Sequence, residues 1–426
     1  MLKSQELKLA TIEKTQIIVG VDIAKKTNWA VMISPFNRLL QKAFSFNNTK
    51  EGFKNLVENV EKIKEIQKAE NVIVGMEPTG HYWKPLANYL FNKNIKVVMV
   101  NSFHVKKAKE LDDNSPTKND KKDALTIARL IKDGRYNEVY IPEGVYADLR
   151  NISNTRFELI RKRNAVKNRI VAIMDEYFPE YIYVFKGIFC KTSIQILKNC
   201  PFPEDIKLKG IEEIITLIKQ EVKKLYSKKQ IIELKNNALS TVGVTRGITT
   251  AKIQLKMYIE DYELLEKQIQ ETERQLEKLL EQVPYAKHIL EIPAIGTVNF
   301  AHFLGEIGEL TRFSHWQQIR KYAGYNLVEN SSGEHKGKSK ISKRGRHMLR
   351  SVLYQMALVM IAKNKEIKQL YGYLTKRKDN PLKKKQAVVA VIGKILSIIF
   401  ALVKKDEKYD STKVFNQERQ LELVAA

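Results

Sequence analysis

The sequence predicts an α/β domain followed by a long helical region. Residues 16–135 alternate short apolar runs with helical stretches, which is typical of a mixed sheet flanked by helices. From about residue 146 the apolar residues instead recur with helical spacing. We therefore expect three domains, over residues 1–145, 146–285 and 286–426: a mixed sheet, a helical and coiled-coil region, and a mainly helical C-terminal domain.

The first domain is expected to contain five strands and four helices. The strands cover residues 16–22, 28–34, 39–46, 71–76 and 95–100, and the helices cover residues 50–68, 82–93, 102–110 and 120–133. Three early strands followed by alternating units indicate a mixed sheet. A polar segment, 112–116, predicts a loop before the last helix, which Asn119 or Asp120 can cap.

The central domain contains the most regular apolar pattern of the chain. From Leu255 to Val283, apolar and aromatic residues recur at alternating spacings of three and four, with Thr272 as the polar interruption. This pattern predicts a heptad seam over about four heptads, which Pro284 ends. The seam can pair with another chain or fold back on the basic helix expected over residues 148–178, and the pattern is equally compatible with both.

The third domain is expected to hold a turn, a polar loop and three helices. The turn covers residues 292–296, the Gly/Ser/Lys-rich loop 331–345, and the helices 298–307, 346–363 and 383–404. The apolar stretch 387–403 is shorter than the ~20 residues that span a bilayer, and Lys394 interrupts it. We therefore predict a buried helix there and no membrane partner.

The charge of the chain favours a polyanionic partner. Lys and Arg number 74 against 48 Asp and Glu, which gives a net charge of +26. The alternative is a generally basic protein without such a partner. Two cysteines exclude a disulfide framework, and residues 1–15 lack the apolar core of a signal peptide. These features predict a protein of the reducing cytoplasm.

Four carboxylates indicate a metal centre. Asp22 and Glu77 each end an apolar strand-like run, while Asp120 and Asp123 lie three apart on one helix face. A carboxylate at the end of a buried strand is costly unless positive charge meets it. Four such acids can hold two divalent ions, Mg²⁺ or Mn²⁺, for phosphoryl transfer. Any one of them alone is better explained as a cap or a solvated acid, but the ordered set favours the metal centre.

The polar loop of the third domain is the second candidate site. It contains Ser331 and Ser332 together with five cations that can contact phosphates: Lys336, Lys338, Lys340, Lys343 and Arg344. A serine in this setting can anchor a phosphate or attack phosphorus. The residues alone favour an anchor, because no general base with a recognisable spacing accompanies the serines.

Several segments resemble the DEDD transposases of the insertion-sequence-110 family. Residues 18–25, 76–82 and 119–124 are similar to the three acidic blocks of the family, and 322–324, 332–333, 341–345 and 349–350 to its C-terminal domain. The resemblance covers residues 16–135 and 285–405. It implies a RuvC-like domain with the ribonuclease H fold in the first part of the chain. It also implies that the four acids are catalytic metal ligands and that Ser332, or its neighbour Ser331, is the nucleophile.

The resemblance also implies a reaction and its partners. The expected function is DNA transposition, in which Ser332 attacks a DNA phosphate and forms a covalent serine–DNA link. The implied partners are donor and target double-stranded DNA, a structured guide RNA, and further copies of the chain in a dimer or tetramer. In the family, the acids of one subunit and the serine of another share one site. The implied location is the cytoplasm of a bacterium or archaeon, at the nucleoid.

The chain departs from the family pattern at three positions. The turn 292–296 resembles a helix-hairpin-helix element, but Ala294 replaces its usual first glycine. Tyr325 and Leu327 replace a usual leucine and proline. The residues of the turn are equally compatible with a phosphate contact and with a simple packing turn. Two other functions also fit the chain: a RuvC-like junction resolvase without serine chemistry, and a non-enzymatic nucleic-acid scaffold.

Overall fold

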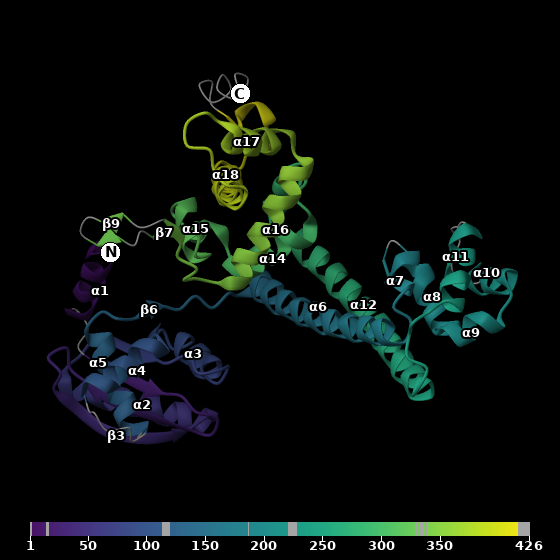
Figure 1. Ribbon diagram of the computed structural model, residues 1–426. Helices are drawn as coiled ribbons and strands as arrows, with labels where there is room; N and C mark the ends of the chain where they lie inside the picture. Colours follow the sequence, from purple (N-terminus) through teal and green to yellow (C-terminus); the bar gives the residue numbers. More distant parts are fainter. Residues whose placement is uncertain are drawn as a thin grey trace. The chain divides into compact units, whose positions relative to one another are not determined.

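The computed structural model describes residues 2–13, 17–112, 120–185, 187–219, 228–328, 331–332, 335–336 and 339–415 (Figure 1). Its contacts divide the chain into two compact units, Met1–Ile141 and Pro142–Ala426. The first unit contains a sheet with helices, and the second is mainly helical. The additional domain boundary near residue 285 stays a prediction.

The first unit is built on a six-stranded mixed sheet in the order β3-β2-β1-β4-β5-β6. The strands are β1 (Ile17–Asp22), β2 (Thr27–Ile33), β3 (Leu39–Asn47), β4 (Val72–Met76), β5 (Lys96–Met99) and β6 (Asn137–Glu138). Strands β1, β4 and β5 run parallel, while β2, β3 and β6 pair antiparallel to their neighbours. The mixed sheet expected from the sequence is therefore confirmed, with β6 as a strand that the sequence did not predict.

Helices cover both faces of this sheet. They are α1 (Leu2–Glu13), α2 (Lys50–Gln67), α3 (Trp83–Phe91), α4 (Ser102–Asp112) and α5 (Asp120–Lys132). Alternate residues of β1 enter two different cores, because successive side chains of a strand point to opposite faces. Val19 and Val21 pack with residues of α2 and α3, whereas Ile18 packs with residues of α4 and α5. The sheet is thus buried on both sides along β1.

Gly20 in the middle of β1 allows α5 to lie directly on the strand. A Cβ atom built on Gly20 would lie 2.2 Å from the Ala124 carbonyl oxygen and 2.5 Å from the Ala128 backbone nitrogen. Any side chain at this position would therefore force the helix and strand apart. The contact fixes the first turn of α5 relative to the end of β1.

The two longest described helices of the second unit are α6 (Gly144–Tyr177) and α12 (Ile248–Glu281). They pack against each other along their length and lie side by side in Figure 1. Ion pairs tie them together, with Nε of Arg156 2.9 Å from Glu273 and Nη1 of Arg163 3.0 Å from Glu266. The apolar seam of α12 therefore folds back on the basic helix of its own chain, one of the two arrangements that the sequence allowed.

Five shorter helices connect α6 to α12 and surround a separate apolar core. They are α7 (Tyr181–Val184), α8 (Lys191–Asn199), α9 (Pro203–Leu208), α10 (Ile211–Lys219) and α11 (Lys228–Leu239). Their largest buried side chains include Phe178, Tyr181 and Phe202. Tyr181 is satisfied despite its burial, because its hydroxyl lies 2.9 Å from the Ser193 hydroxyl.

The C-terminal part surrounds a larger apolar core. It contains α13 (Ala286–Leu290), α14 (Thr297–Ile307), η1 (Leu310–Arg312), α15 (Trp316–Tyr322), α16 (His347–Lys363), α17 (Lys365–Lys376), α18 (Lys384–Lys405) and η2 (Ser411–Lys413). Among the described residues, α18 is the one helix long and apolar enough to span a membrane, but half of its apolar window is buried in this core. The helix is thus packed inside the unit, as the sequence predicts.

The turn between α13 and α14 holds an alanine in a left-handed conformation. Ala294 has φ +74°, a region that costs a residue with a Cβ roughly 1–2 kcal/mol. Its neighbour Pro293 accepts a hydrogen bond of 3.2 Å from Asn364, a buried side chain that also caps α17. Packing therefore holds the turn in a shape that suits glycine.

Ala294→Gly is expected to stabilise the protein by about 0.5–1 kcal/mol. The substitution removes the left-handed strain, and the greater backbone freedom of glycine in the unfolded chain offsets part of the gain. Urea unfolding of both proteins measures the difference. Ala172→Gly at an exposed position of α6 is the matched control and is expected to destabilise by about 1 kcal/mol. Equal destabilisation by both substitutions would contradict the strain at Ala294.

Candidate carboxylate centre and serine hairpin

The sheet places two of the predicted acids at one edge. Asp22 is the last residue of β1, and Glu77 directly follows β4. The two strands are parallel, with Val21 paired to Met76, so Asp22 and Glu77 leave the sheet side by side. The carboxyl ends of neighbouring parallel strands are a common place for binding sites in such sheets. This part of the arrangement follows directly from the sequence pattern.

Helix α5 supplies the other two acids from its first turn. Asp120 is exposed and Asp123 is half-buried. The close contact of α5 with Gly20 positions this turn near the end of β1. Acidic side chains in the first turn also interact favourably with the positive end of the helix dipole. The four acids therefore come from three elements that pack against one another.

The acids interact electrostatically. The pKa of Asp22 rises from its usual value to about 6, first because of burial and then because of Asp123, Asp120 and Glu77. Lys109 opposes this rise with its positive charge. A shift of this kind is typical of functional carboxylate clusters, where like charges share one site. The charges of Asp123, Asp120 and Glu77 thus all act on Asp22, and we call these four acids the carboxylate centre.

Lys109 of α4 is a member of this centre that the sequence did not reveal. Its ammonium group forms an ion pair with the Asp123 carboxylate. It is one of several lysines on α4, and only the packing of α4 against α5 identifies which one faces the acids. Lysine supplies one positive charge to the centre, where a divalent ion supplies two.

The donor set suits a hard divalent cation in its chemistry. Carboxylate oxygens are the ligands that Mg²⁺ and Mn²⁺ prefer, and the pKa of Asp22 is raised first by burial and then by the neighbouring acids. Within the described ranges, no three His, Cys, Asp or Glu side chains lie close enough together to hold a metal ion. The chemistry of the residues therefore fits the expected metal, and in this structure Asp123 forms its ion pair with Lys109.

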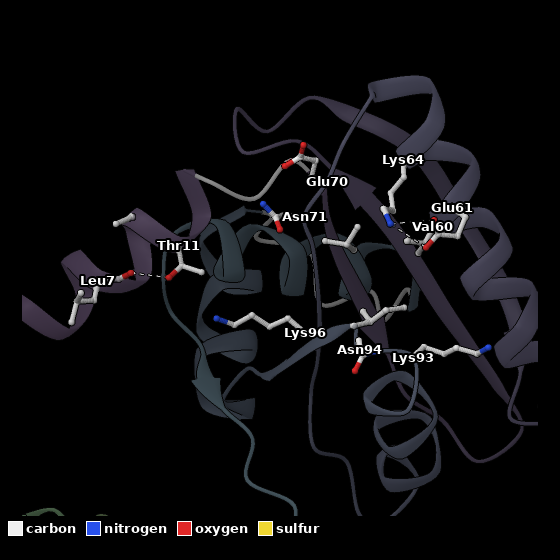
Figure 2. Close-up of a pocket in the computed structure, with 13 residues that line it drawn as sticks. Leu7, Thr11, Val60, Glu61, Lys64, Glu70, Asn71, Lys93, Asn94 and Lys96 are labelled. Atoms are coloured by element: carbon white, nitrogen blue, oxygen red, sulfur yellow. Dashed lines mark hydrogen bonds and ion pairs between the residues drawn. The ribbon is translucent and has the colours of Figure 1, made fainter. Parts of the chain in front are cut away.

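A pocket of about 540 Å³ in the first unit lies away from the acids (Figure 2). Its lining includes Asn71 and Val72 at the start of β4, and Ile95 and Lys96 at the start of β5. Because β1, β4 and β5 are parallel, these residues lie at the edge of the sheet opposite to Asp22 and Glu77. The pocket is therefore separate from the carboxylate centre.

The predicted serine loop of the second unit contains two short antiparallel pairs. Strand β7 (Leu327–Val328) pairs with β10 (Lys340–Ile341), and β8 (Ser331–Ser332) pairs with β9 (His335–Lys336). Ser332 lies opposite His335 in this register. We call the described residues of the segment 322–346 the serine hairpin. The sequence predicted a flexible loop over residues 331–345, whereas residues 331–332, 335–336 and 340–341 of it form strand pairs.

Hydrogen bonds close the base of the serine hairpin. The Lys343 amide donates to the Gly324 carbonyl at 3.0 Å, and the Arg350 guanidinium donates to carbonyls of both arms, Ala323 at 2.9 Å and Lys343 at 3.2 Å. Gly324 has φ +76°, and an added Cβ would lie 2.8 Å from Arg350. Glycine is therefore required for this closure.

The departures from the family pattern have a structural account at Tyr325. This side chain is buried, and its hydroxyl donates a 2.8 Å hydrogen bond to the Arg350 carbonyl, so it ties the hairpin to α16. Leu327 is exposed in β7. A tyrosine can therefore occupy the position because it buries its ring and still satisfies its hydroxyl.

The five cations predicted to contact phosphate are distributed along the hairpin. Lys340, Lys343 and Arg344 are exposed. Lys336 belongs to β9, and Lys338 lies outside the described residues. The carboxylate centre and the serine hairpin belong to different units of the chain.

Comparisons with known proteins match both of these regions. The DEDD transposase model of the IS110 family matches residues 19–179, which include all four acids. The model described as "Transposase IS116/IS110/IS902 family" matches residues 286–372, which include the serine hairpin. The two matches together cover more than half of the chain.

Several similar proteins carry related names. The pilin gene-inverting protein of Moraxella bovis is 24% identical over 402 residues, covering 92% of this chain and 97% of its own. The IS116 uncharacterized 44.8 kDa protein of Streptomyces clavuligerus is 21% identical, covering 91% and 95%. The IS1111A transposase of Coxiella burnetii is 30% identical over 128 residues, covering 29% and 34%. The acids, the hairpin and these matches agree in one conclusion: the chain belongs to the IS110 family of transposases.

Proposed function

We propose that this transposase excises and integrates an insertion sequence through attack of Ser332 on a DNA phosphate, assisted by Mg²⁺ or Mn²⁺. The observation that carries the proposal is the placement of Asp22 and Glu77 at the ends of two paired parallel strands, where the charges of Asp123 and Asp120 also act on Asp22. Four like charges that act on one another are costly for folding alone, which favours a functional reason for their placement. We also propose a RuvC-like ribonuclease H fold for the first unit, since its mixed sheet presents the acids at strand ends.

In this proposal Asp22, Glu77, Asp120 and Asp123 would hold the divalent ions, and Lys109 is the cation beside Asp123 that they would replace. Bound there, the ions would supply positive charge that stabilises the negative charge of the transition state and of the ionised nucleophile. Ser332 forms an Oγ–P bond while one P–O ester bond of the DNA strand breaks. The serine hydroxyl proton passes to solvent, and the released sugar oxygen takes up a proton.

A covalent serine–DNA link favours rejoining over simple cutting. The phosphodiester is exchanged rather than hydrolysed, so a sugar hydroxyl of another strand can attack the same phosphorus and release Ser332. The Moraxella bovis relative is named as a pilin gene-inverting protein. Inversion of a DNA segment requires that DNA strands are both cut and rejoined. This similarity supports recombination as the reaction class.

The substrates that fit this surface are donor and target double-stranded DNA. Lys340, Lys343 and Arg344 are exposed, and with Lys336 and Lys338 they are proposed to contact DNA phosphates. The net charge of +26 supports polyanion binding by the chain as a whole. We further propose a structured guide RNA, and a dimer or tetramer in which the acids of one subunit meet the serine of another.

Purification of the tagged protein from bacterial cells, followed by sequencing of the bound RNA, tests the guided function. The expected result is one discrete RNA that restores recombination between a donor and a target DNA after ribonuclease treatment has abolished it. A chain carrying Lys340→Ala and Arg344→Ala is a companion variant for phosphate contact, expected to need lower salt for DNA binding. Recombination that persists after complete RNA removal would exclude the guide while leaving the transposase chemistry intact.

A further inference from the structure

The serine hairpin is joined to the core of the second unit at the first turn of α16. Arg346 is the residue that caps this helix, and its amide donates a 2.9 Å hydrogen bond to the Tyr322 carbonyl on the opposite arm of the hairpin. Its guanidinium lies 5.8 Å from the centre of the Tyr322 ring. Arg346 thus joins its own arm of the hairpin to the opposite arm at Tyr322.

The side chain of Arg346 extends from the hairpin into the core. Its Nε donates to Oε2 of Glu306 at 2.8 Å, and its Nη2 donates to Oε1 at 3.3 Å. Glu306 belongs to α14, and its side chain is 2% exposed. A bidentate pair between a guanidinium and a carboxylate fixes the relative orientation of the two side chains as well as the distance between them.

Helix α14 is itself anchored where it carries Glu306. Arg150 of α6 donates hydrogen bonds to the carbonyls of Gly305 at 2.9 Å and Glu306 at 3.1 Å. A Cβ on Gly305 would lie 2.8 Å from the Leu149 carbonyl oxygen, so α14 and α6 are in close backbone contact here. A rigid crossing of two helices therefore holds the carboxylate that receives Arg346.

We propose that Glu306 and Arg346 are positioning residues for the serine hairpin. They transmit the fixed geometry of the α6–α14 crossing to the base of the hairpin, and thereby set where Ser332 is presented. This inference deepens the proposed function and depends on the role of Ser332 in it. Buried ion pairs contribute little to stability compared with apolar residues, but they define one geometry, which is what a positioned nucleophile needs.

Misplacement of a reacting group by about 1 Å can reduce a rate by about 10²-fold. Arg346→Lys keeps the positive charge beside Glu306 but loses the planar two-pronged contact. We therefore expect Arg346→Lys to lower the single-turnover rate of DNA strand cleavage about 10²-fold, with DNA affinity changed less than about twofold. Glu306→Gln, which keeps the shape and removes the charge, is expected to act in the same direction.

Hydrogen exchange measures positioning independently of catalysis. In both variants the amides of Ser342, Lys343 and Arg346, which bond across the hairpin base, are expected to exchange at least about tenfold faster. The amides of α18 in the same core are expected to keep their exchange rates. The matched control is Arg163→Lys, which weakens the ion pair to Glu266 between α6 and α12 and is expected to leave the hairpin amides unchanged.

Three results would overturn the positioning role. The first is an unchanged amide exchange rate at the hairpin base in both variants. The second is faster amide exchange that extends equally through α18. The third is faster exchange at the hairpin base with undiminished DNA cleavage, while Ser332→Ala abolishes cleavage. The proposed function fails separately: if Ser332→Ala also cleaves normally, the serine chemistry is wrong, whereas local loosening of the hairpin in Arg346→Lys still supports the structural part of the inference.

Discussion

Ser332→Ala is expected to abolish DNA strand cleavage, with a loss of at least about 10³-fold in rate. Removal of a nucleophile that forms a covalent intermediate leaves only binding and electrostatic stabilisation. The measurement uses end-labelled DNA and denaturing electrophoresis, in which wild-type protein gives a labelled protein–DNA adduct that protease digests. The adduct is expected to disappear in the variant, while DNA binding stays within about twofold, because the hydroxyl contributes little to phosphate contact.

Ser331→Ala is the matched control for this experiment. Ser331 and Ser332 lie in the same two-residue strand, so each substitution removes one hydroxyl group from the same short element. Retained cleavage in Ser331→Ala together with loss in Ser332→Ala identifies the nucleophile. The reverse pattern moves the nucleophile by one residue. Full cleavage in both variants instead favours the junction resolvase, in which water attacks the phosphate.

Asp22→Asn is expected to lower metal-dependent cleavage by about 10³-fold or more while making the metal-free protein more stable. The carboxylate is proposed to hold the divalent ions that stabilise the transition state, and an amide is a much weaker ligand. The same carboxylate is destabilising in the folded chain, because burial and three neighbouring acids raise its pKa to about 6. An active site often carries such a conflict between stability and activity.

The pH dependence of this stabilisation has a definite sign. The folded-state pKa of Asp22 lies above its usual value of 3.8, so ionisation costs stability above pH 6, and the cost disappears as the pH falls from about 6 toward 4. Because solvent screens the partly exposed carboxylate, we expect Asp22→Asn to raise the free energy of unfolding by only about 1 kcal/mol at pH 8 and by almost nothing at pH 4. Urea unfolding in EDTA at both pH values measures it.

Asp133→Asn in the same unit is the control for Asp22. Its carboxylate lies outside the carboxylate centre, 3.2 Å from the Lys132 ammonium group at the end of α5. We expect wild-type cleavage and a stability change of less than about 0.5 kcal/mol. Unchanged recombination by Asp22→Asn in Mg²⁺ would refute the metal centre and favour a nucleic-acid scaffold.

Residue patterns predicted the carboxylate edge because its geometry is local. A short apolar run that ends in an acid predicts both a buried strand and the position of the acid at its end, and parallel pairing then brings Asp22 beside Glu77. The i,i+3 spacing of Asp120 and Asp123 equally implies one helix face. These features need only the periodicity of each element and the order of strands.

Contacts between distant segments could not be predicted in the same way. The seam of α12 has the same heptad pattern whether its partner is α6 or another chain, and Thr272 does not distinguish the two, because its hydroxyl bonds to the Ile269 carbonyl of its own helix. Lys109 is indistinguishable from other lysines of α4, and Glu306 and Arg346 are forty residues apart. Only packing of the whole unit brings such partners together.

Gly20 has no side chain, and the close helix contact that this allows has an electrostatic consequence. Apolar residues of α5, including Ala124, Ile127 and Ala128, are completely buried in the core that contains Ile18 of β1. Their burial favours close approach of helix and strand, and this approach crowds Asp123 and Asp120 toward Asp22. Packing in the hydrophobic core thus brings the like charges of α5 toward Asp22. Under the proposed function, the affinity of the carboxylate centre for divalent cations depends on how tightly α5 packs on β1, as well as on the carboxylates themselves.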